Sequence, residues 1–233
     1  MILPPVQQFG TLIRRYKRFL ADISLTTGET LTVHCPNSGS MRGCSDPGSP
    51  VMISKADNPR RKYGWTLEMV QRHNIWIGLN TARTNKIIHE ALKNGTINDF
   101  GHILSIRPEI KVSDRSRLDF LLTTETGAVY LEVKNCSLAE NGIAMFPDAV
   151  TARGTKHLHE LDRLRREGNK CAVLFCIQRA DADRFIPAAH IDPVYAEALW
   201  KVRENGVQVL AYRAEVAPEA ITLTTKLPVK TNE

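Results

Sequence analysis

The residues of this sequence best suited to chemistry are two acids and a lysine, Asp119, Glu132 and Lys134, within the segment RLDFLLTTETGAVYLEVKN at positions 117 to 135. Side chains alternate in direction along a strand, so Glu132 and Lys134 share a face if this segment forms a hairpin. A turn at residues 125 to 127 then brings Asp119 opposite residues 132 to 134, where facing Cβ atoms lie about 4.5–5.5 Å apart. The spacing therefore predicts two carboxylates and an ammonium group in one small site.

Two carboxylates at this separation are suited to a divalent cation, and without one their repulsion raises the pKa of one of them. Mg²⁺ (or Mn²⁺) is the expected cofactor, because it takes hard oxygen ligands and keeps waters for chemistry. Such a metal stabilises charge that builds on a phosphate and acidifies a bound water, while Lys134 orients that water or stabilises the transition state. The predicted reaction is phosphodiester hydrolysis, with Asp119, Glu132 and Lys134 as catalytic residues and both acids as metal ligands. An alternative stays open at this point, in which Glu132 and Lys134 merely pair with neighbours on an exposed sheet face.

The surrounding pattern predicts the elements that position these residues. Gly, Pro, Asn and Asp separate short strand-like segments at 11–25, 31–35, 50–56, 65–70 and 74–79, as in a small β-barrel or curled sheet. After residue 83 the hydrophobic period predicts an α/β domain with a sheet covered on both sides, made of helices at 84–94, 154–167 and 193–205 and strands near 103–112, 116–123, 129–135, 171–178 and 207–215. We therefore expect two domains, residues 1–82 and 83–233, in a chain that is α+β overall.

The net charge of +6 is concentrated in the first domain, where residues 1 to 80 hold ten Lys and Arg against five Asp and Glu. A basic surface favours a polyanion, because Lys and Arg release the counterions condensed on phosphates. Basic residues beside Tyr16, Tyr63 and Trp65 suit a groove that follows a nucleic-acid backbone and stacks bases. The predicted DNA contacts are Arg14, Arg15, Lys17, Arg18, Arg60, Arg61 and Lys62, with Arg153 and Lys156 at the start of a helix in the second domain. Basic side chains kept only for solubility are the alternative.

Composition narrows the class of protein. No apolar run approaches the roughly 20 residues needed to span a bilayer, and the first residues lack the pattern of a signal peptide. Five cysteines in scattered contexts give neither a disulfide framework nor paired zinc spacing. We expect a cytoplasmic protein with DNA as its partner, without a membrane or an evident protein partner; a homodimer stays open.

The acid and lysine segment resembles the PD-(D/E)xK nuclease superfamily, with Leu118 in place of the proline. More specifically, the segments RRYKRFLADI, CPNSGSMRGC, RLDF, EVKN, FPDAVTARGTKHLHEL and LPV resemble the sugar fermentation stimulation protein A family over essentially the whole chain. This resemblance implies an N-terminal OB-like β-barrel, a restriction-endonuclease-like αβββαβ domain, non-specific DNA binding and a role in regulating sugar metabolism. In some nucleases of the superfamily an acid on the first helix completes the metal shell, which suggests Glu90 as a third metal ligand; a solvated glutamate is the alternative. A DNA-binding regulator that keeps the nuclease fold without cleaving is the rival function.

Overall fold

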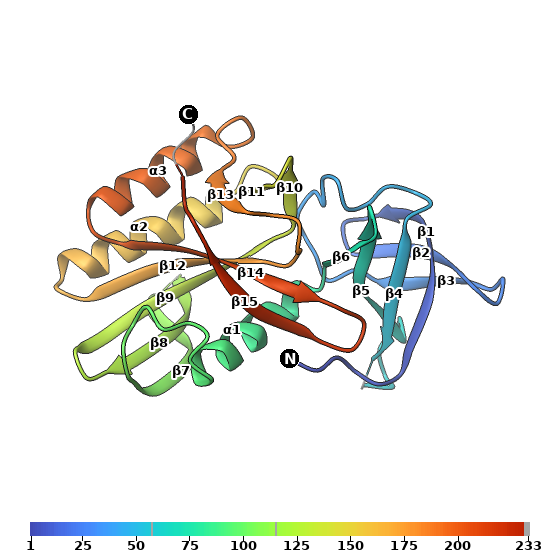
Figure 1. Ribbon diagram of the computed structural model, residues 1–233, viewed down its shortest axis with the longest axis horizontal. Coiled ribbons are helices and arrows are strands. Elements are labelled where there is room, and N and C mark those ends of the chain that lie inside the picture. The colour runs from blue at the N-terminus through green and yellow to red at the C-terminus, as the bar shows by residue number, and fades with distance from the viewer. Residues whose placement is uncertain (57, 115, 231–233) are drawn as a thin grey trace.

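The N-terminal part is a small β-barrel (Figure 1) in the computed structural model, which describes residues 1–56, 58–114 and 116–230. Its strands are β1 (Gln7–Tyr16), β2 (Leu20–Leu25), β3 (Thr30–His34), β4 (Pro50–Lys55), β5 (Trp65–Arg72) and β6 (Ile75–Gly78). They pair in the order β3-β2-β1-β4-β5-β6, and a further contact between His34 and Thr66 joins β3 to β5 and closes the barrel. The predicted OB-like barrel is confirmed.

The segment predicted as one strand at 11–25 is a hairpin. Tyr16 pairs with Leu20, so residues 17 to 19 form a three-residue turn, in which Lys17 and Arg18 have φ angles of 49° and 64°. Hairpin turns with positive φ usually carry Asn or Gly, and this turn carries neither. The sequence therefore gives no local signal that β1 ends and β2 begins.

The second part is a six-stranded sheet between helices. Its elements are η1 (Thr81–Arg83), α1 (Thr84–Lys93), β7 (Ile103–Ser113), β8 (Ser116–Thr124), β9 (Gly127–Cys136), β10 (Leu138–Glu140), β11 (Ile143–Phe146), α2 (Ala152–Arg166), β12 (Lys170–Ile177), β13 (Arg184–Pro187), α3 (Pro193–Glu204), β14 (Gln208–Val216) and β15 (Ile221–Leu227). The sheet order is β15-β14-β12-β9-β8-β7, and α1 covers one face while α2 and α3 cover the other (Figure 1). The element order confirms the expected restriction-endonuclease-like core. The pattern missed β10, β11 and β13, which form a separate small sheet, and the edge strand β15.

Local sequence explains the helices that carry the site. Leu158, Leu161 and Leu164 recur at helical spacing in α2 and are all buried against β12. The Thr151 side chain accepts a hydrogen bond from the backbone N–H of Gly154 and caps the helix. At α3, Asp192 caps the helix and Pro193 occupies its first turn.

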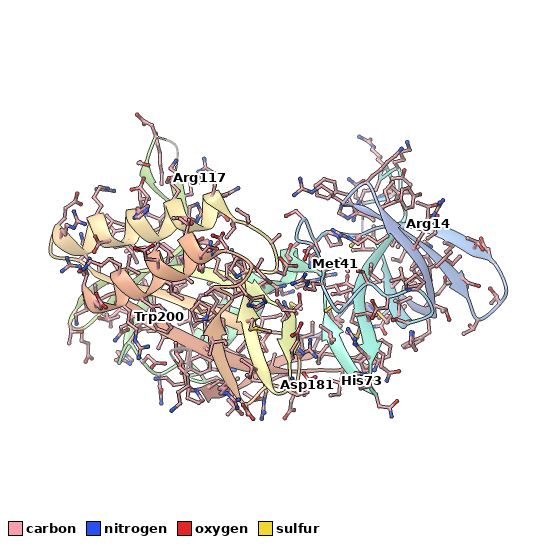
Figure 2. All side chains as sticks on the ribbon, turned by 90° about the horizontal axis from the view of Figure 1, so that it is seen from above. Arg14, Met41, His73, Arg117, Asp181 and Trp200 are labelled. Atoms are coloured by element: carbon pink, nitrogen blue, oxygen red, sulfur yellow. The ribbon has the colours of Figure 1, made fainter. Side chains whose placement is uncertain are left out.

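The two parts share a hydrophobic core and are joined by a hydrogen bond between Asp148 and Met41. Met52 and Met69 of the barrel belong to the same hydrophobic cluster as the α1 face of the large sheet. The carboxylate of Asp148 accepts a hydrogen bond from the backbone N–H of Met41 at 2.8 Å, and Met41 lies at the junction of the two parts (Figure 2). These contacts fix the barrel loop at 36–44 against the second part. Within the described ranges, no helix has the length and apolar character needed to cross a membrane.

Candidate active site

The two acids lie where β8 separates from β9. The ladder between these strands runs from the pair Thr124 and Gly127 to the pair Phe120 and Leu131 and does not continue to Asp119. Side-chain alternation also breaks here, because Phe120 packs in the core beneath α1 whereas Leu118, two residues earlier, packs in the core beneath α2. Asp119 thus lies where the side chains of β8 change from one face of the sheet to the other, in the gap beside β9.

Asp119 is held by one side chain and one backbone group. Its Oδ1 accepts a hydrogen bond from Asn85 Nδ2 at 2.8 Å, and its Oδ2 accepts one from the backbone N–H of Val133 at 2.7 Å. Burial, together with the nearby charge of Glu132, raises the pKa of Asp119 to about 6. The predicted repulsion between the two carboxylates is therefore present, although burial is the larger cause.

Glu132 is buried, and its two oxygens have different surroundings. Oε1 accepts a hydrogen bond from Lys134 Nζ at 2.6 Å and also bonds Nδ1 of His157. Oε2 is buried and has no hydrogen-bond partner among the described residues. Burial alone would raise the pKa of Glu132, but the hydrogen bond from His157 and the charge of Lys134 outweigh it and hold the pKa below its ordinary value. The exposed-pair alternative for Glu132 and Lys134 is excluded, since only 4% of the Glu132 side chain and 12% of the Lys134 side chain is exposed.

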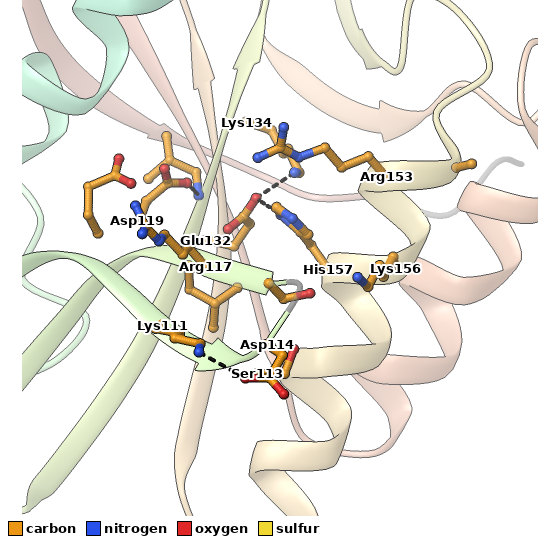
Figure 3. A pocket seen from close by; sticks show the side chains of 15 residues that line it. Lys111, Ser113, Asp114, Arg117, Asp119, Glu132, Lys134, Arg153, Lys156 and His157 are labelled. Atoms are coloured by element: carbon orange, nitrogen blue, oxygen red, sulfur yellow. Dashed lines mark hydrogen bonds and ion pairs between the residues drawn. The ribbon is translucent and has the colours of Figure 1, made fainter.

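The acids open into a cavity of about 1060 Å³ with a basic rim. Figure 3 shows Asp119 and Glu132 gathered with Lys134 and His157, while the Arg153 side chain reaches from α2 towards Lys134. The basic residues that line this cavity are Lys111, Arg117, Lys134, Arg153 and Lys156. The structure thus brings together five predicted residues, Asp119, Glu132, Lys134, Arg153 and Lys156. Arg117, two residues before Asp119 in β8, also lines the cavity, and its place in the RLDF segment is the signal in the sequence that could have identified it.

The donor set suits a hard cation. Two carboxylates converge on the cavity, and one carboxylate oxygen is buried without a partner, which costs free energy unless a cation or another group satisfies it. Within the described ranges, however, no group of three or more His, Cys, Asp or Glu side chains is arranged as a ready metal cluster. Asp119 and Glu132 offer the hard oxygen ligands that divalent cations such as Ca²⁺ and Mg²⁺ take.

Glu90 does not join this site. Its carboxylate accepts a hydrogen bond from the N-terminal ammonium group of Met1 at 2.9 Å, and that ammonium group also donates to the carbonyl of Ile221 in β15. The helix residue that reaches Asp119 is Asn85, in the first turn of α1. The prediction of Glu90 as a metal ligand is corrected, because the chain terminus takes the carboxylate.

The basic residues predicted in the barrel fall into three groups by their contacts. Arg14 pairs with Asp22 and lies over the Tyr16 ring, and Arg61 donates to the Thr66 hydroxyl. Four further basic residues are exposed, namely Lys17 and Arg18 at the hairpin turn and Arg60 and Lys62 in the loop before β5. Arg15 differs from all of these because its guanidinium group donates to four backbone carbonyls, those of Arg18, Asn37, Gly39 and Ser40, at 2.8 to 3.4 Å.

Replacing Arg15 with alanine should therefore destabilise the protein by about 2–3 kcal/mol, because hydrogen bonds from a charged group to the 37–40 loop are lost. Arg15 as a DNA contact stays a prediction, and the structure adds that its guanidinium group holds the 37–40 loop. Lys17→Ala, at the adjacent exposed turn, is the control and should leave stability unchanged. Urea denaturation of both variants measures the difference, and equal stability would return Arg15 to the role of a surface contact.

Comparison with known proteins agrees with this architecture. A family model described as the sugar fermentation stimulation protein RE domain matches residues 82–220, and one described as the SfsA N-terminal OB domain matches residues 13–79. Sugar fermentation stimulation protein homologs from Desulfotalea psychrophila and Pelobacter propionicus are 54% and 51% identical, over 91% and 98% of this chain and 90% and 99% of their own lengths. The solved structure of Pyrococcus furiosus SfsA in complex with Ca²⁺ shares the fold, with a TM-score of 0.90, 24% identity, and coverage of 99% of this chain and 98% of that one. The chain belongs to the sugar fermentation stimulation protein family.

Proposed function

We propose that this protein binds DNA largely without sequence preference and hydrolyses phosphodiester bonds at Asp119 and Glu132 with the help of a divalent cation. The observation that carries the proposal is the buried, unpartnered Oε2 of Glu132 beside a second carboxylate, at the floor of a cavity with a basic rim. A buried carboxylate oxygen of this kind is suited to a cation, and a rim of Lys and Arg is suited to phosphate. A cytoplasmic location belongs to the same proposal.

Asp119 and Glu132 would hold the cation, and we propose Mg²⁺ or Mn²⁺ because hard oxygen ligands are all that the two acids offer. The Ca²⁺ in the Pyrococcus furiosus relative supports a divalent ion in this fold. When bound, such an ion supplies charge stabilisation at the phosphate and a more acidic water.

The residues of the chain position the reactants. The Nζ of Lys134 orients a water or stabilises charge on the phosphate. His157 Nδ1 bonds Glu132 Oε1 and so fixes the carboxylate with Oε2 unpartnered. Arg117 and Arg153 lie at the rim, where their planar guanidinium groups suit the flanking phosphates.

Binding to DNA should weaken steeply with salt and depend little on sequence, because the case rests on backbone contacts by basic residues. A protein that makes about four phosphate contacts loses about a hundredfold in affinity between 50 and 200 mM salt. Fluorescence anisotropy with two unrelated duplexes at both salt concentrations measures this. An affinity that is insensitive to salt, or a strong preference for one duplex, would contradict the proposal.

A second candidate is a DNA-binding regulator that keeps the nuclease fold without cleavage. It is favoured by the lack of a ready three-ligand cluster in the described part of the chain. The names of the relatives connect the family with sugar fermentation, which suits a regulatory role in sugar metabolism.

Incubation of the pure protein with single-stranded, duplex and branched DNA and with RNA separates the two candidates. Each substrate is tested with Mg²⁺, with Mn²⁺ and with EDTA, and Asp119→Asn is the matched inactive control. Cleavage that needs the metal and is lost in the variant supports hydrolysis at this site. Tight DNA binding by the wild type without any cleavage under these conditions favours the regulator.

A further inference from the structure

We propose that Glu109 is the third carboxylate of the cation site, contributed by β7 in place of an acid on α1. The inference rests on the proposed function and extends it to a residue that the spacing of Asp119, Glu132 and Lys134 does not indicate. Glu109 lines the same cavity as Asp119 and Glu132.

The backbone of β7 changes face between Ile106 and Val112. Ile106 packs with the core beneath α1, whereas Val112, which strict alternation would place on the same side, packs with the core beneath α2. Between them Glu109 has a φ of 55°, a conformation that residues other than glycine and asparagine rarely adopt. Strained backbone of this kind is concentrated at functional sites.

The change of face in β7 lies across from the change of face in β8. Pro108 pairs with Phe120 and Ile110 pairs with Leu118, so Glu109 stands opposite Asp119. Both strands therefore present an acid to the cavity at the same level.

The net charge of the site supports a third acid as a ligand. Lys134 pairs with Glu132, so Asp119, Glu132 and Lys134 together carry only one net negative charge when both acids are ionised. Arg117 and Arg153 at the rim further oppose a cation. Glu109 brings the net charge of the acids and Lys134 to minus two, which matches a divalent ion.

The Glu109 carboxylate is available for this role. It is exposed, and among the described residues it has no hydrogen-bond or ion-pair partner, so its side chain can turn towards an ion. Glu132 supplies an independent sign of a ligand, because its Oε2 is buried and unpartnered in the same cavity. Helix α1 offers no equivalent acid, since Glu90 is bound to the Met1 ammonium group.

Titration of the metal-free full chain with Mn²⁺ by isothermal calorimetry tests the assignment. Glu109→Gln should weaken Mn²⁺ binding by about tenfold or more. Glu109→Asn, which also removes the carboxylate but tolerates a positive φ, should do the same. The matched control is Glu125→Gln, an exposed glutamate at the β8–β9 turn outside the cavity, which should bind as the wild type does.

The outcomes separate this inference from the proposed function. Wild-type affinity in both Glu109 variants would overturn the inference and leave the function of Asp119 and Glu132 standing. A wild type that binds no Mn²⁺ would overturn both. Melting of each variant in EDTA shows whether the fold is intact, and a loss of affinity in folded Glu109→Gln and Glu109→Asn but not in Glu125→Gln supports the third carboxylate.

Discussion

Asp119→Asn should stabilise the metal-free protein relative to the wild type as pH rises from 4 to 8. Burial and Glu132 raise the pKa of Asp119 from 3.8 to about 6, so the folded state penalises the ionised carboxyl. Well below pH 3.8 the carboxyl is protonated in both states and this penalty is absent. Above pH 6 it is fully present, and two pKa units correspond to about 3 kcal/mol. The free energy of unfolding of the variant should therefore gain on that of the wild type by about 2–3 kcal/mol across this range.

Urea denaturation of both proteins in EDTA at pH 4, 6 and 8 measures this gain. Hydrogen bonds lost from Asn85 or Val133 shift the variant by a similar amount at each pH, so the pH dependence isolates the ionisation. A difference between the two proteins that stays constant with pH would show that Asp119 is not strained by its charge.

Glu132→Gln should have the opposite effect and destabilise the protein by about 3 kcal/mol at pH 7. The substitution leaves Lys134 and His157 without their buried anionic partner, and breaking such a pair is more costly than removing it entirely. The low pKa of Glu132 means that this stabilisation is present above pH 4.5 and is lost as pH falls, so the two proteins should converge in acid.

The double variant Glu132→Gln with Lys134→Met provides the control for this prediction. It removes both charges of the pair, so it should recover part of the stability lost in the single variant. Unfolding by urea gives all three values. If Glu132→Gln is as stable as the wild type, Glu132 forms no stabilising buried ion pair. Mutual repulsion would then be the main effect of the charge at both Asp119 and Glu132.

Short-range pattern was sufficient for much of the fold. The leucines of α2 and the cap and proline of α3 define those helices locally, and the β8–β9 hairpin follows from its turn. Segments of three or four residues, such as β10, β11 and β13, are too short for a hydrophobic period to identify. The turn at Lys17 and Arg18 has no local signal in the sequence, because its residues are not typical of that conformation.

The residues of the site also divide into those that a local pattern identifies and those that depend on contacts far along the chain. Asp119, Glu132 and Lys134 lie on one hairpin, so spacing and alternation were enough to bring them together. The roles of Glu90 and Arg15 depend on partners far along the chain, Met1 and Ile221 for the first and the 37–40 loop for the second. No local pattern reports such contacts. Glu109 depends on a change of face in β7 that only the packing of both cores reveals.

The central claim is that Asp119 and Glu132 hold a divalent cation, and thermal melting of the wild type with and without millimolar Mg²⁺ or Mn²⁺ tests it most directly. A ligand that binds only the folded state raises the melting temperature, and does so more the tighter it binds. We predict a metal-induced rise for the wild type that is absent in Asp119→Asn and in Glu132→Gln, while Glu125→Gln responds as the wild type does. A wild type whose melting temperature does not respond to either metal would contradict the account.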